Sequence, residues 1–300
     1  MRATTPHKTG ANLADVSETV ADVRLRVQSY RSRLDAVSVG LVPTMGYFHE
    51  GHLSLMRAAR RECGFVVTSI FVNPTQFSPD EDYDTYPRDP DHDISLAARE
   101  GVDLVFAPSV EEIYAGGVGT TVEAGAAASG LCGARRPGHF RGVATVVAKL
   151  FNIVAPDIAY FGQKDAQQAA VIRQMARDLD FKVAIRVCPT VRESDGLAMS
   201  SRNVNLSPAE RAEAAALYDG LKKARAAVAS GEVSDAARIK KIIHDTVASR
   251  PLVALEYVEV VDPDTMQPLA YAGPGAMSAI AAHVGSTRLI DNMVLLPREG

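Results

Sequence analysis

Short apolar runs alternate with longer stretches of helical spacing over the first two thirds of the chain. The runs are rich in β-branched residues and punctuated by Pro and Gly, which predicts β-strands. The predicted strands are Val37–Val42, Phe65–Val72, Asp103–Ala107, Asp157–Phe161 and Val183–Val187. Because strands that alternate with helices are typical of βαβ units, we expect an α/β fold with a Rossmann-like, doubly wound parallel sheet. Ligands of such sheets bind beyond the carboxyl ends of the strands, so the loops there are where chemistry is expected.

The pattern changes after about Thr190. Two Ala-rich segments of helical spacing are followed by strand-like runs, which indicates a separate α+β unit. The predicted helices are Pro208–Ser230 and Ser234–Ser249, and the predicted strands are Ala254–Val261 and Met277–Val284. A length of 300 residues with 47% hydrophobic content supports two domains. We expect a larger domain over residues 1–190, a smaller C-terminal domain over residues 191–300, and a disordered tail at residues 1–14.

Charge and cysteine content exclude several classes of protein. With 32 Lys and Arg against 36 Asp and Glu, the net charge of -4 argues against a nucleic-acid partner. Cys63, Cys132 and Cys188 are far apart and form no C-x-x-C pair, so neither a disulfide framework nor a zinc site is indicated. The most apolar long run, Val143–Ala155, is too short to span a bilayer and is interrupted by Lys149. We therefore expect a soluble cytoplasmic protein with no membrane partner.

Two histidines three residues apart follow the first predicted strand. In the sequence LVPTMGYFHEGHLSLMRAAR, Pro43 and Gly46 mark a turn, and His49 and His52 stand where a helix begins. Residues three apart share a helix face, so both imidazoles and the free backbone N–H groups of the first turn would point at one spot. Because the helix dipole favours an anion there, the segment predicts a phosphate site. Surface or metal-binding histidines are the alternative interpretation.

This stretch resembles the HIGH signature of the nucleotidyltransferase superfamily. The second signature of that superfamily is a basic or Ser-rich loop that binds the triphosphate, and Met199–Asn203 resembles it. Ser200 and Ser201 offer hydroxyl and backbone donors, and Arg202 offers a planar fork that suits phosphate oxygens. The preceding residues Val191–Ala198 are typical of a mobile loop, and the connecting segment Val191–Leu206 could act as a hinge or as a lid over ATP. Ordinary loop composition is the alternative.

A lysine follows another predicted strand. In the segment FGQKDAQQ, Lys164 occupies a strand-to-helix loop, where its ammonium is well placed to meet phosphate. The adjacent Asp165 could accept a hydrogen bond from a ribose hydroxyl. One turn further along the helix, Gln168 has both a donor and an acceptor and could orient a hydroxy acid. A solvated surface lysine is the alternative for Lys164.

Neutral amides and a run of acids follow the strand that ends in FVNPTQF. Asn73 and Gln76 could bind hydroxyls and carboxylates without adding charge, or could simply cap the turn around Pro74. The run Asp80–Asp93 contains seven acidic residues. We expect most of them to form a solvated loop and a helix start, with one or two available to hold Mg²⁺.

Together these segments resemble one family, the pantoate–β-alanine ligases, also called pantothenate synthetases. The resemblance extends from about Val37 to Asn292, through PTMGYFHEGH, FVNPTQF, YPRDP, RRPGHFRGV, FGQKDAQQ, DGLAMSSRN and GSTRLIDN. It implies an ATP-binding ligase of pantothenate biosynthesis that forms a homodimer. In this family ATP and pantoate give pantoyl adenylate and pyrophosphate, and β-alanine then releases pantothenate and AMP. Arg136 and His139, in RRPGHF, would lie at the edge of the cleft, with roles left open.

The resemblance also implies catalytic and nucleotide-binding residues. His49, His52 and Lys164 match the positions that stabilise the charge developing on the α-phosphate. The family's proton donor falls on His52, although that side chain could instead act mainly as a hydrogen-bond donor. The implied ATP-site residues are Met45, Gly46, His49, His52, Gly162, Gln163, Lys164, Asp165, Val191, Met199, Ser200, Ser201 and Arg202.

Substrate and metal residues complete the implied site. Gln76 and Gln168 would hold pantoate, with Asn73 beside them. Members of the family often carry two adjacent acids where this sequence has His92 and Asp93, so Asp93 is the predicted Mg²⁺ ligand.

Two other functions fit the histidine pair. Another small-molecule nucleotidyltransferase would transfer AMP or CMP to a phosphorylated acceptor, which should demand a further Arg or Lys cluster. A nucleotide-sensing module would bind ATP but release no pyrophosphate. Gln76 and Gln168 favour a neutral hydroxy-acid pocket and hence the ligase.

Overall fold

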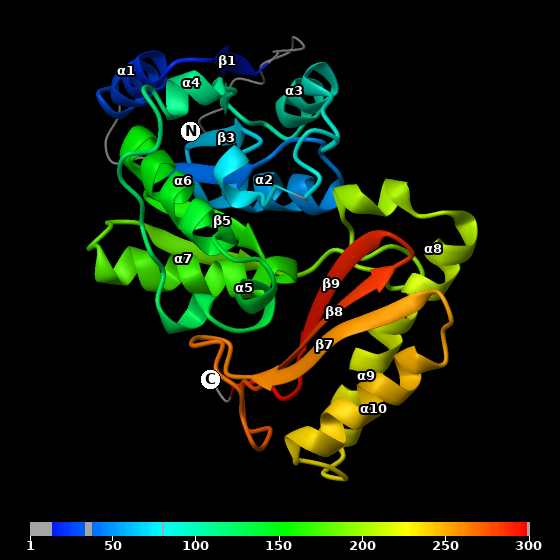
Figure 1. Ribbon diagram of the computed structural model, residues 1–300. Helices are drawn as coiled ribbons and strands as arrows, with labels where there is room; N and C mark the ends of the chain where they lie inside the picture. Colours follow the sequence, from blue (N-terminus) through cyan, green and yellow to red (C-terminus); the bar gives the residue numbers. More distant parts are fainter. Residues whose placement is uncertain (1–13, 34–37, 80, 299–300) are drawn as a thin grey trace, which may run out of the picture.

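The larger part of the molecule is built on a six-stranded parallel sheet (Figure 1). The computed structural model describes residues 14–33, 38–79 and 81–298. The strands are β1 (Asp15–Ser17), β2 (Val39–Thr44), β3 (Phe65–Ile70), β4 (Leu104–Phe106), β5 (Ile158–Gly162) and β6 (Ala184–Cys188). Their order in space is β1-β4-β3-β2-β5-β6. The predicted α/β fold with a parallel sheet is therefore confirmed.

The strands that the apolar runs predict are all present, with bounds that differ by a few residues. Val39, Leu41 and Val67 are fully buried, as expected of strands covered by helices on both faces. The apolar pattern does not predict β1, because its sequence Asp-Val-Ser is too short to show a period. The predicted N-terminal tail lies outside the described residues except for Ala14, which is buried.

Helices cover both faces of this sheet. One face carries α1 (Val20–Arg31), α6 (His139–Val154) and α7 (Ala166–Asp178), and the other carries α2 (Glu50–Glu62) and α3 (Pro90–Arg99). Two short helices, α4 (Val110–Ile113) and α5 (Leu131–Arg135), lie in the connections. Because α6 packs against the sheet and also contacts α1 and α7, it is buried on most sides.

The C-terminal part forms a second layer structure with a core of its own. Its antiparallel sheet has the order β7-β8-β9, with β7 (Val253–Val261), β8 (Met277–Val284) and β9 (Thr287–Val294). The helices α8 (Pro208–Ala214), α9 (Ala216–Ala229) and α10 (Ala236–Ala248) accompany it, and α9 and α10 contact the sheet (Figure 1). The α+β character is as predicted.

Two details of this part differ from the sequence-based expectation. The predicted helix Pro208–Ser230 is two helices that meet at Ala215. The strand β9 is not predicted, because the polar residues Asp291 and Asn292 interrupt its apolar pattern. Both of these side chains are nevertheless buried, since they face polar partners in other parts of the chain. The division into domains 1–190 and 191–300 stays a prediction.

The order of the strands reverses between β2 and β5. The chain runs from β2 to β3 and β4 on one side, and continues with β5 and β6 on the other. Because β2 and β5 are parallel neighbours, the loops after Thr44 and Gly162 start from the same edge of the sheet. Such a switch point is where doubly wound sheets bind ligands. The fold thus brings the predicted histidine and lysine loops together.

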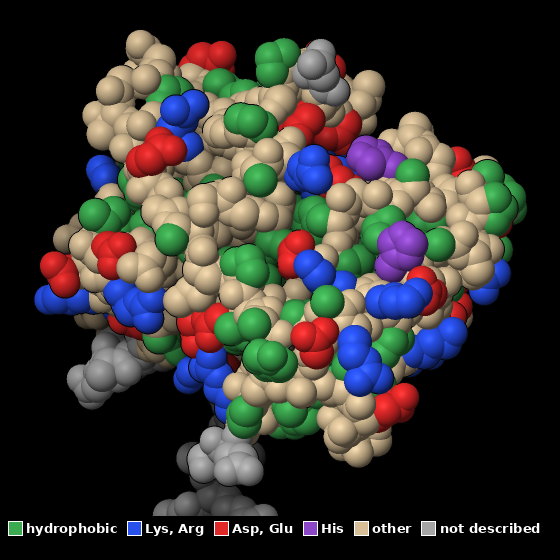
Figure 2. Space-filling view, turned by 60° about the horizontal axis from the view of Figure 1, so that its bottom comes forward, with side chains coloured by type: hydrophobic (Ala, Val, Ile, Leu, Met, Phe, Trp, Pro, Cys, Tyr) green, Lys and Arg blue, Asp and Glu red, His purple; other side chains and the backbone are tan. Residues whose placement is uncertain are grey.

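The surface shows no single dominant charge on the face drawn in Figure 2. Basic and acidic side chains are interspersed there, in keeping with the small net charge of -4. Among the described helices, none combines the length and the apolar character that crossing a bilayer requires.

Candidate active site

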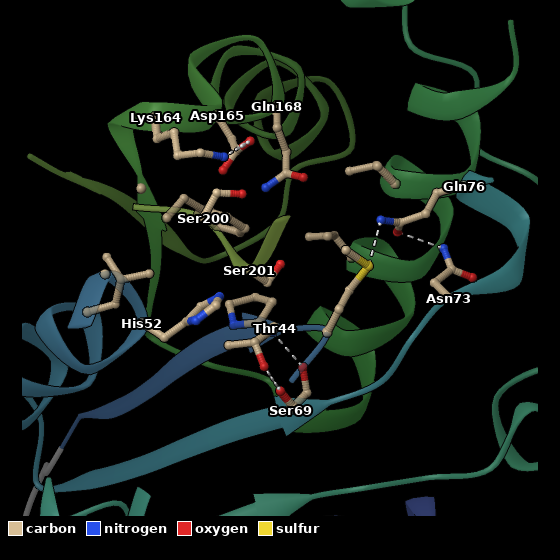
Figure 3. Close-up of a pocket in the computed structure, with 18 of the residues that line it drawn as sticks. Thr44, His52, Ser69, Asn73, Gln76, Lys164, Asp165, Gln168, Ser200 and Ser201 are labelled. Carbon is tan, nitrogen blue, oxygen red and sulfur yellow. Dashed lines mark hydrogen bonds and ion pairs between the residues drawn. The ribbon is translucent and has the colours of Figure 1, made fainter. Parts of the chain in front are cut away.

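A cleft with a volume of about 220 Å³ lies beyond the carboxyl ends of β2, β3 and β5. Most residues that the sequence assigns to ATP or pantoate line it. These are Met45, His49, His52, Asn73, Gln76, Gly162, Lys164, Asp165, Gln168, Val191, Met199, Ser200, Ser201 and Arg202. Figure 3 shows Lys164, Asp165 and Gln168 on one side, His52 on another, and Gln76 with Asn73 at the far end.

The two histidines lie at the beginning of α2, with ring centroids 4.1 Å apart and ring planes tilted by 33°. His49 is the N-cap residue, and its Nδ1 accepts a hydrogen bond from the Gly51 N–H at 3.1 Å. The Nδ1 of His52 accepts from the His49 N–H at 3.3 Å. A Cβ on Gly51 would lie 2.7 Å from the His49 ring, so only glycine fits between the two histidines. Since both Nδ1 atoms accept, both rings carry their proton on Nε2.

Both imidazoles are neutral near pH 7. Burial, followed by the charge of Lys164, lowers the pKa of His49 to about 4. Burial, then the neighbouring His49 and Lys164, lowers the pKa of His52 well below 6.5. The pair therefore presents two Nε2–H donors at the beginning of α2, where the helix dipole favours an anion. This arrangement is suited to bind phosphate oxygens.

The lysine lies in a turn that follows β5. Lys164 belongs to the short 3₁₀ helix η3 (Gln163–Asp165), and its Nζ is 3.5 Å from the Asp165 carboxylate. This side chain is 21% exposed and faces the histidine pair across the cleft (Figure 3). A half-buried cation opposite two neutral donors creates one site with anion-binding groups on both walls.

Two residues implied for ATP do not line the cleft. Gln163 instead donates from Nε2 to Asn292 Oδ1 at 2.9 Å, which joins η3 to β9. Gly46 occupies the turn after β2 with a φ of 86°, and its N–H donates to Thr44 Oγ1. The Gln163 side chain and the backbone of Gly46 therefore shape the loops beside the cavity and do not line it.

Hydrogen bonds connect the Ser-rich loop to the segment that contains the acidic run. The guanidinium of Arg202 donates from Nε and Nη2 to the two oxygens of Asp82, both at 2.9 Å. Ser201, at the start of the 3₁₀ helix η4 (Ser201–Asn205), shares a 3.2 Å hydrogen bond with the Tyr86 hydroxyl. The tyrosine belongs to YPRDP, so that motif holds the loop predicted as a lid. A phosphate that binds Arg202 must compete with Asp82.

The amide of Asn73 is fully used by protein groups. Its Nδ2 donates to Gln76 Oε1 at 3.1 Å and to the Gly142 carbonyl at 3.2 Å, while its Oδ1 accepts from Tyr114 and Thr75. Both donors are thus occupied by protein groups, and one of them holds Gln76. Direct binding of substrate by Asn73 stays a prediction. A Cβ on Gly142 would lie 2.3 Å from the Thr75 carbonyl, so this glycine lets α6 approach the turn.

Arg136 and His139, which the sequence left without roles, form a chain of hydrogen bonds behind Gln76. The guanidinium of Arg136 donates to both oxygens of Glu81, at 2.6 and 2.7 Å, and to His139 Nε2 at 3.1 Å. His139 Nδ1 in turn lies 2.8 Å from the Gln76 carbonyl, to which it donates. Two acids of the run, Glu81 and Asp82, therefore pair with cleft arginines, while Asp84, Asp89 and Asp91 are exposed as expected. This chain of hydrogen bonds joins residues that are far apart in the sequence, so only the folded structure reveals it.

The pH dependence of stability should report on His139. Burial, followed by the nearby Arg136 charge, lowers its pKa to about 4 from 6.5, so its stabilising contribution is complete above pH 6.5 and is lost as the pH falls toward 4. We expect the unfolding free energy to drop by roughly 1 to 2 kcal/mol through this residue between pH 7 and 5. Urea titrations at both pH values measure it. His139→Gln should show a smaller drop, and an equal drop would contradict the assignment.

Asp93 has a role different from the predicted one. Its carboxylate is 1% exposed, and it accepts from the Tyr47 N–H at 2.7 Å and the Phe48 N–H at 2.6 Å. Tyr47 has a φ of 53°, next to the left-handed Gly46, so Asp93 stabilises a strained turn that leads into His49. These contacts give Asp93 a structural role, and its assignment as a Mg²⁺ ligand stays a prediction. Within the described residues, no cluster of three or more His, Cys, Asp or Glu could hold a metal ion.

Comparisons with known proteins point to one family. The sequence profile of the family described as pantoate-beta-alanine ligase matches residues 15–294. The chain is 54% identical over 279 residues to pantothenate synthetase from Thermoanaerobacter sp. (strain X514), covering 93% of this chain and 98% of that relative.

Solved structures show the same fold. The crystal structure of pantothenate synthetase from Thermus thermophilus matches with a TM-score of 0.88 and 46% identity, covering 94% of this chain and 100% of that one. Pantoate-beta-alanine ligase from Francisella tularensis, complexed with beta-gamma ATP and beta-alanine, matches with a TM-score of 0.76 and 34% identity, covering 94% and 98%.

Proposed function

The chain belongs to the pantoate-beta-alanine ligase family and catalyses the ATP-dependent condensation of pantoate with β-alanine, and we propose that its cleft does so through a pantoyl adenylate. The pantoate carboxylate attacks the α-phosphorus of ATP, and pyrophosphate leaves. The β-alanine amine then attacks the acyl carbon, and AMP leaves with the electron pair of the acyl–oxygen bond. One observation carries the proposal: Lys164, His49 and His52 line a single cleft, with Lys164 and His52 on different sides of it (Figure 3).

The protein positions the reactants and neutralises charge. In the transition state of the first step, negative charge builds on the oxygens around the α-phosphorus. The ammonium of Lys164 and the Nε2–H groups of His49 and His52 stabilise it from opposite walls. Because neither imidazole is protonated before ATP binds, both act as hydrogen-bond donors to phosphate and not as proton sources.

The remaining cleft residues hold the nucleotide. Met45, Gly162, Val191 and Met199 contribute backbone and apolar surface, which suits the adenosine part. Ser200, Ser201 and Arg202 contact the outer phosphates. When these phosphates bind, they replace Asp82 as the acceptor of the hydrogen bonds from the Arg202 guanidinium. The loop then closes over ATP as a lid.

Pantoate binds at the end of the cleft that carries neutral amides. Gln76 is held by Asn73, and its Nε2 lies 3.1 Å from Met45 Sδ, an exchangeable contact with a weak acceptor. Gln168 is half-buried, and its amide makes no hydrogen bond to the described residues, which leaves it available for a hydroxy acid. The nearby Arg136 is already paired with Glu81. This favours a hydroxy acid over the phosphorylated acceptor of the competing transferase hypothesis.

Mg²⁺ would enter together with ATP. Among the described residues that line the cleft, Asp165 provides the one carboxylate, and Mg²⁺ bound to nucleotide needs only one or two such ligands. The cleft therefore fits the ion, with Asp165 as its protein ligand in place of Asp93. When bound, the ion supplies charge neutralisation on the phosphates.

Two matched substitutions test this metal assignment. We expect Asp165→Asn to raise the Mg²⁺ concentration needed for half-maximal adenylation by at least about threefold, because a carboxylate ligand is lost. Asp93→Asn should leave that concentration unchanged and instead lower stability, because an acceptor for the Tyr47 or Phe48 N–H is lost. Magnesium titrations of pyrophosphate release measure both. The reverse pattern would restore Asp93 as the ligand.

One experiment tests the reaction and both competing functions. The protein is incubated with ATP, Mg²⁺ and pantoate, pyrophosphate is measured, and β-alanine is then added. Pantoate-dependent pyrophosphate release, followed by AMP and pantothenate only after β-alanine, is the expected result. Release without pantoate would contradict the adenylate route, and binding without release would indicate a nucleotide sensor.

We also propose a cytoplasmic homodimer, whose mass in light scattering should be twice that of the chain.

A further inference from the structure

The motif GSTRLIDN has no role in the site described so far. It forms β9 and the turn before it, in the C-terminal part of the chain, and it ends at Asn292. Asn292 is only 5% exposed. A buried amide must find partners for its donors and its acceptor, so the location of those partners indicates what the residue does.

The hydrogen-bond partners of the Asn292 side chain all belong to the turn that carries Lys164. The two Nδ2–H groups donate to the carbonyls of Gln163 at 2.8 Å and of Lys164 at 3.0 Å. The Oδ1 atom accepts from Gln163 Nε2 at 2.9 Å. Both donors and the acceptor are therefore directed at two consecutive residues of η3. Asn292 therefore satisfies two backbone carbonyls of this turn with a side chain from a distant part of the chain.

Asn292 is itself held firmly. Its backbone N–H donates to Asp291 Oδ1 at 2.7 Å. The two oxygens of Asp291 accept a fork of hydrogen bonds from Arg192, at 2.6 and 2.9 Å. The guanidinium of Arg192 lies 4.1 Å from the centroid of the Tyr218 ring on α9. The support for the lysine turn thus extends through the segment that precedes the Ser-rich loop into the C-terminal helices.

We propose that Asn292 is a positioning residue for Lys164. It fixes the peptide groups of η3 and so sets the direction in which the lysine side chain leaves the backbone toward the histidine pair. Asparagine is the side chain that suits this task, because aspartate would place a carboxylate against two carbonyl oxygens. The inference rests on the proposed role of Lys164 in adenylation. It gives the C-terminal part of the chain a direct effect on the reacting groups, in addition to forming a lid.

The first test measures the adenylation step alone. Pantoate-dependent exchange of pyrophosphate into ATP reports that step without β-alanine. We expect Asn292→Ala and Asn292→Asp to lower its kcat by about tenfold or more, since small misplacements of a catalytic group are costly, while the KM for pantoate stays within about twofold. Gln267→Ala is the matched control, because Gln267 Nε2 also donates from the C-terminal part to a backbone carbonyl, Ala126, but far along the chain from Lys164. The control should retain wild-type kcat.

A double-mutant cycle separates positioning from a general loss of structure. If Asn292 acts through Lys164, adding Asn292→Ala to Lys164→Ala should change kcat by no more than about twofold, because the group being positioned is already absent. The proposal would be overturned if Asn292→Ala lowered kcat as much in the Lys164→Ala variant as in the wild type. A wild-type kcat in the Asn292→Ala single variant would also overturn it. A Lys164→Ala variant with an unchanged rate would instead contradict the role of Lys164 on which the proposal rests.

Discussion

Replacing Lys164 with alanine is expected to lower the rate of pantoate-dependent pyrophosphate release by at least about a hundredfold, as loss of a transition-state donor typically does. Lys164 is the cation of the cleft that is free to meet phosphate, because Arg136 and Arg202 already form bidentate pairs with Glu81 and Asp82 in the described structure. Its one acidic neighbour, Asp165, lies 3.5 Å away and is 44% exposed, so the pair is weak.

Two comparisons make the result specific. Lys164→Arg keeps the positive charge but has a different shape, so it should recover only part of the rate. Lys240→Ala removes a lysine that also pairs with a carboxylate, Glu259 at 3.1 Å, but on α10 and away from the cleft. Its rate should equal that of the wild type. An unchanged rate in Lys164→Ala would remove the lysine from the mechanism.

Replacing His52 with alanine is expected to have an effect of similar size. This substitution removes the Nε2–H donor, and it also removes the Nδ1 acceptor of the His49 N–H at the beginning of α2. The first loss lowers transition-state stabilisation and the second loosens the neighbouring His49. We expect adenylation to slow by at least about a hundredfold. Circular dichroism and thermal unfolding of the variant check that the fold is kept.

The role of His52 as a donor can be distinguished from general acid catalysis. A neutral donor can be imitated by an amide, so His52→Gln should be faster than His52→Ala. The adenylation rate of the wild type should also stay level between pH 7 and 9, because the pKa of His52 lies well below 6.5 and the ring is neutral throughout. If His52→Gln were as slow as His52→Ala and the rate fell with rising pH, the imidazolium form would be required.

Much of the fold follows from local sequence patterns. The apolar runs predicted the strands β2 to β8 in kind and place, because a buried strand shows a run of apolar, often β-branched side chains. The strands β1 and β9 were not predicted. β1 is too short to show a pattern, and β9 carries polar residues whose burial makes sense only with the partners that Asn292 and Asp291 meet elsewhere.

The sequence alone predicted most residues that line the cleft, because many of them follow strands and parallel strands end at one edge of the sheet. His49, His52, Lys164 and Gln168 are where that rule puts them. Tertiary structure decided what the side chains do there. Hydrogen-bond partners and burial come from segments far apart in the chain, and these fix tautomers, occupy amides and neutralise charges. For that reason the roles of Asp93, Asn73 and Asn292 had to await the folded molecule.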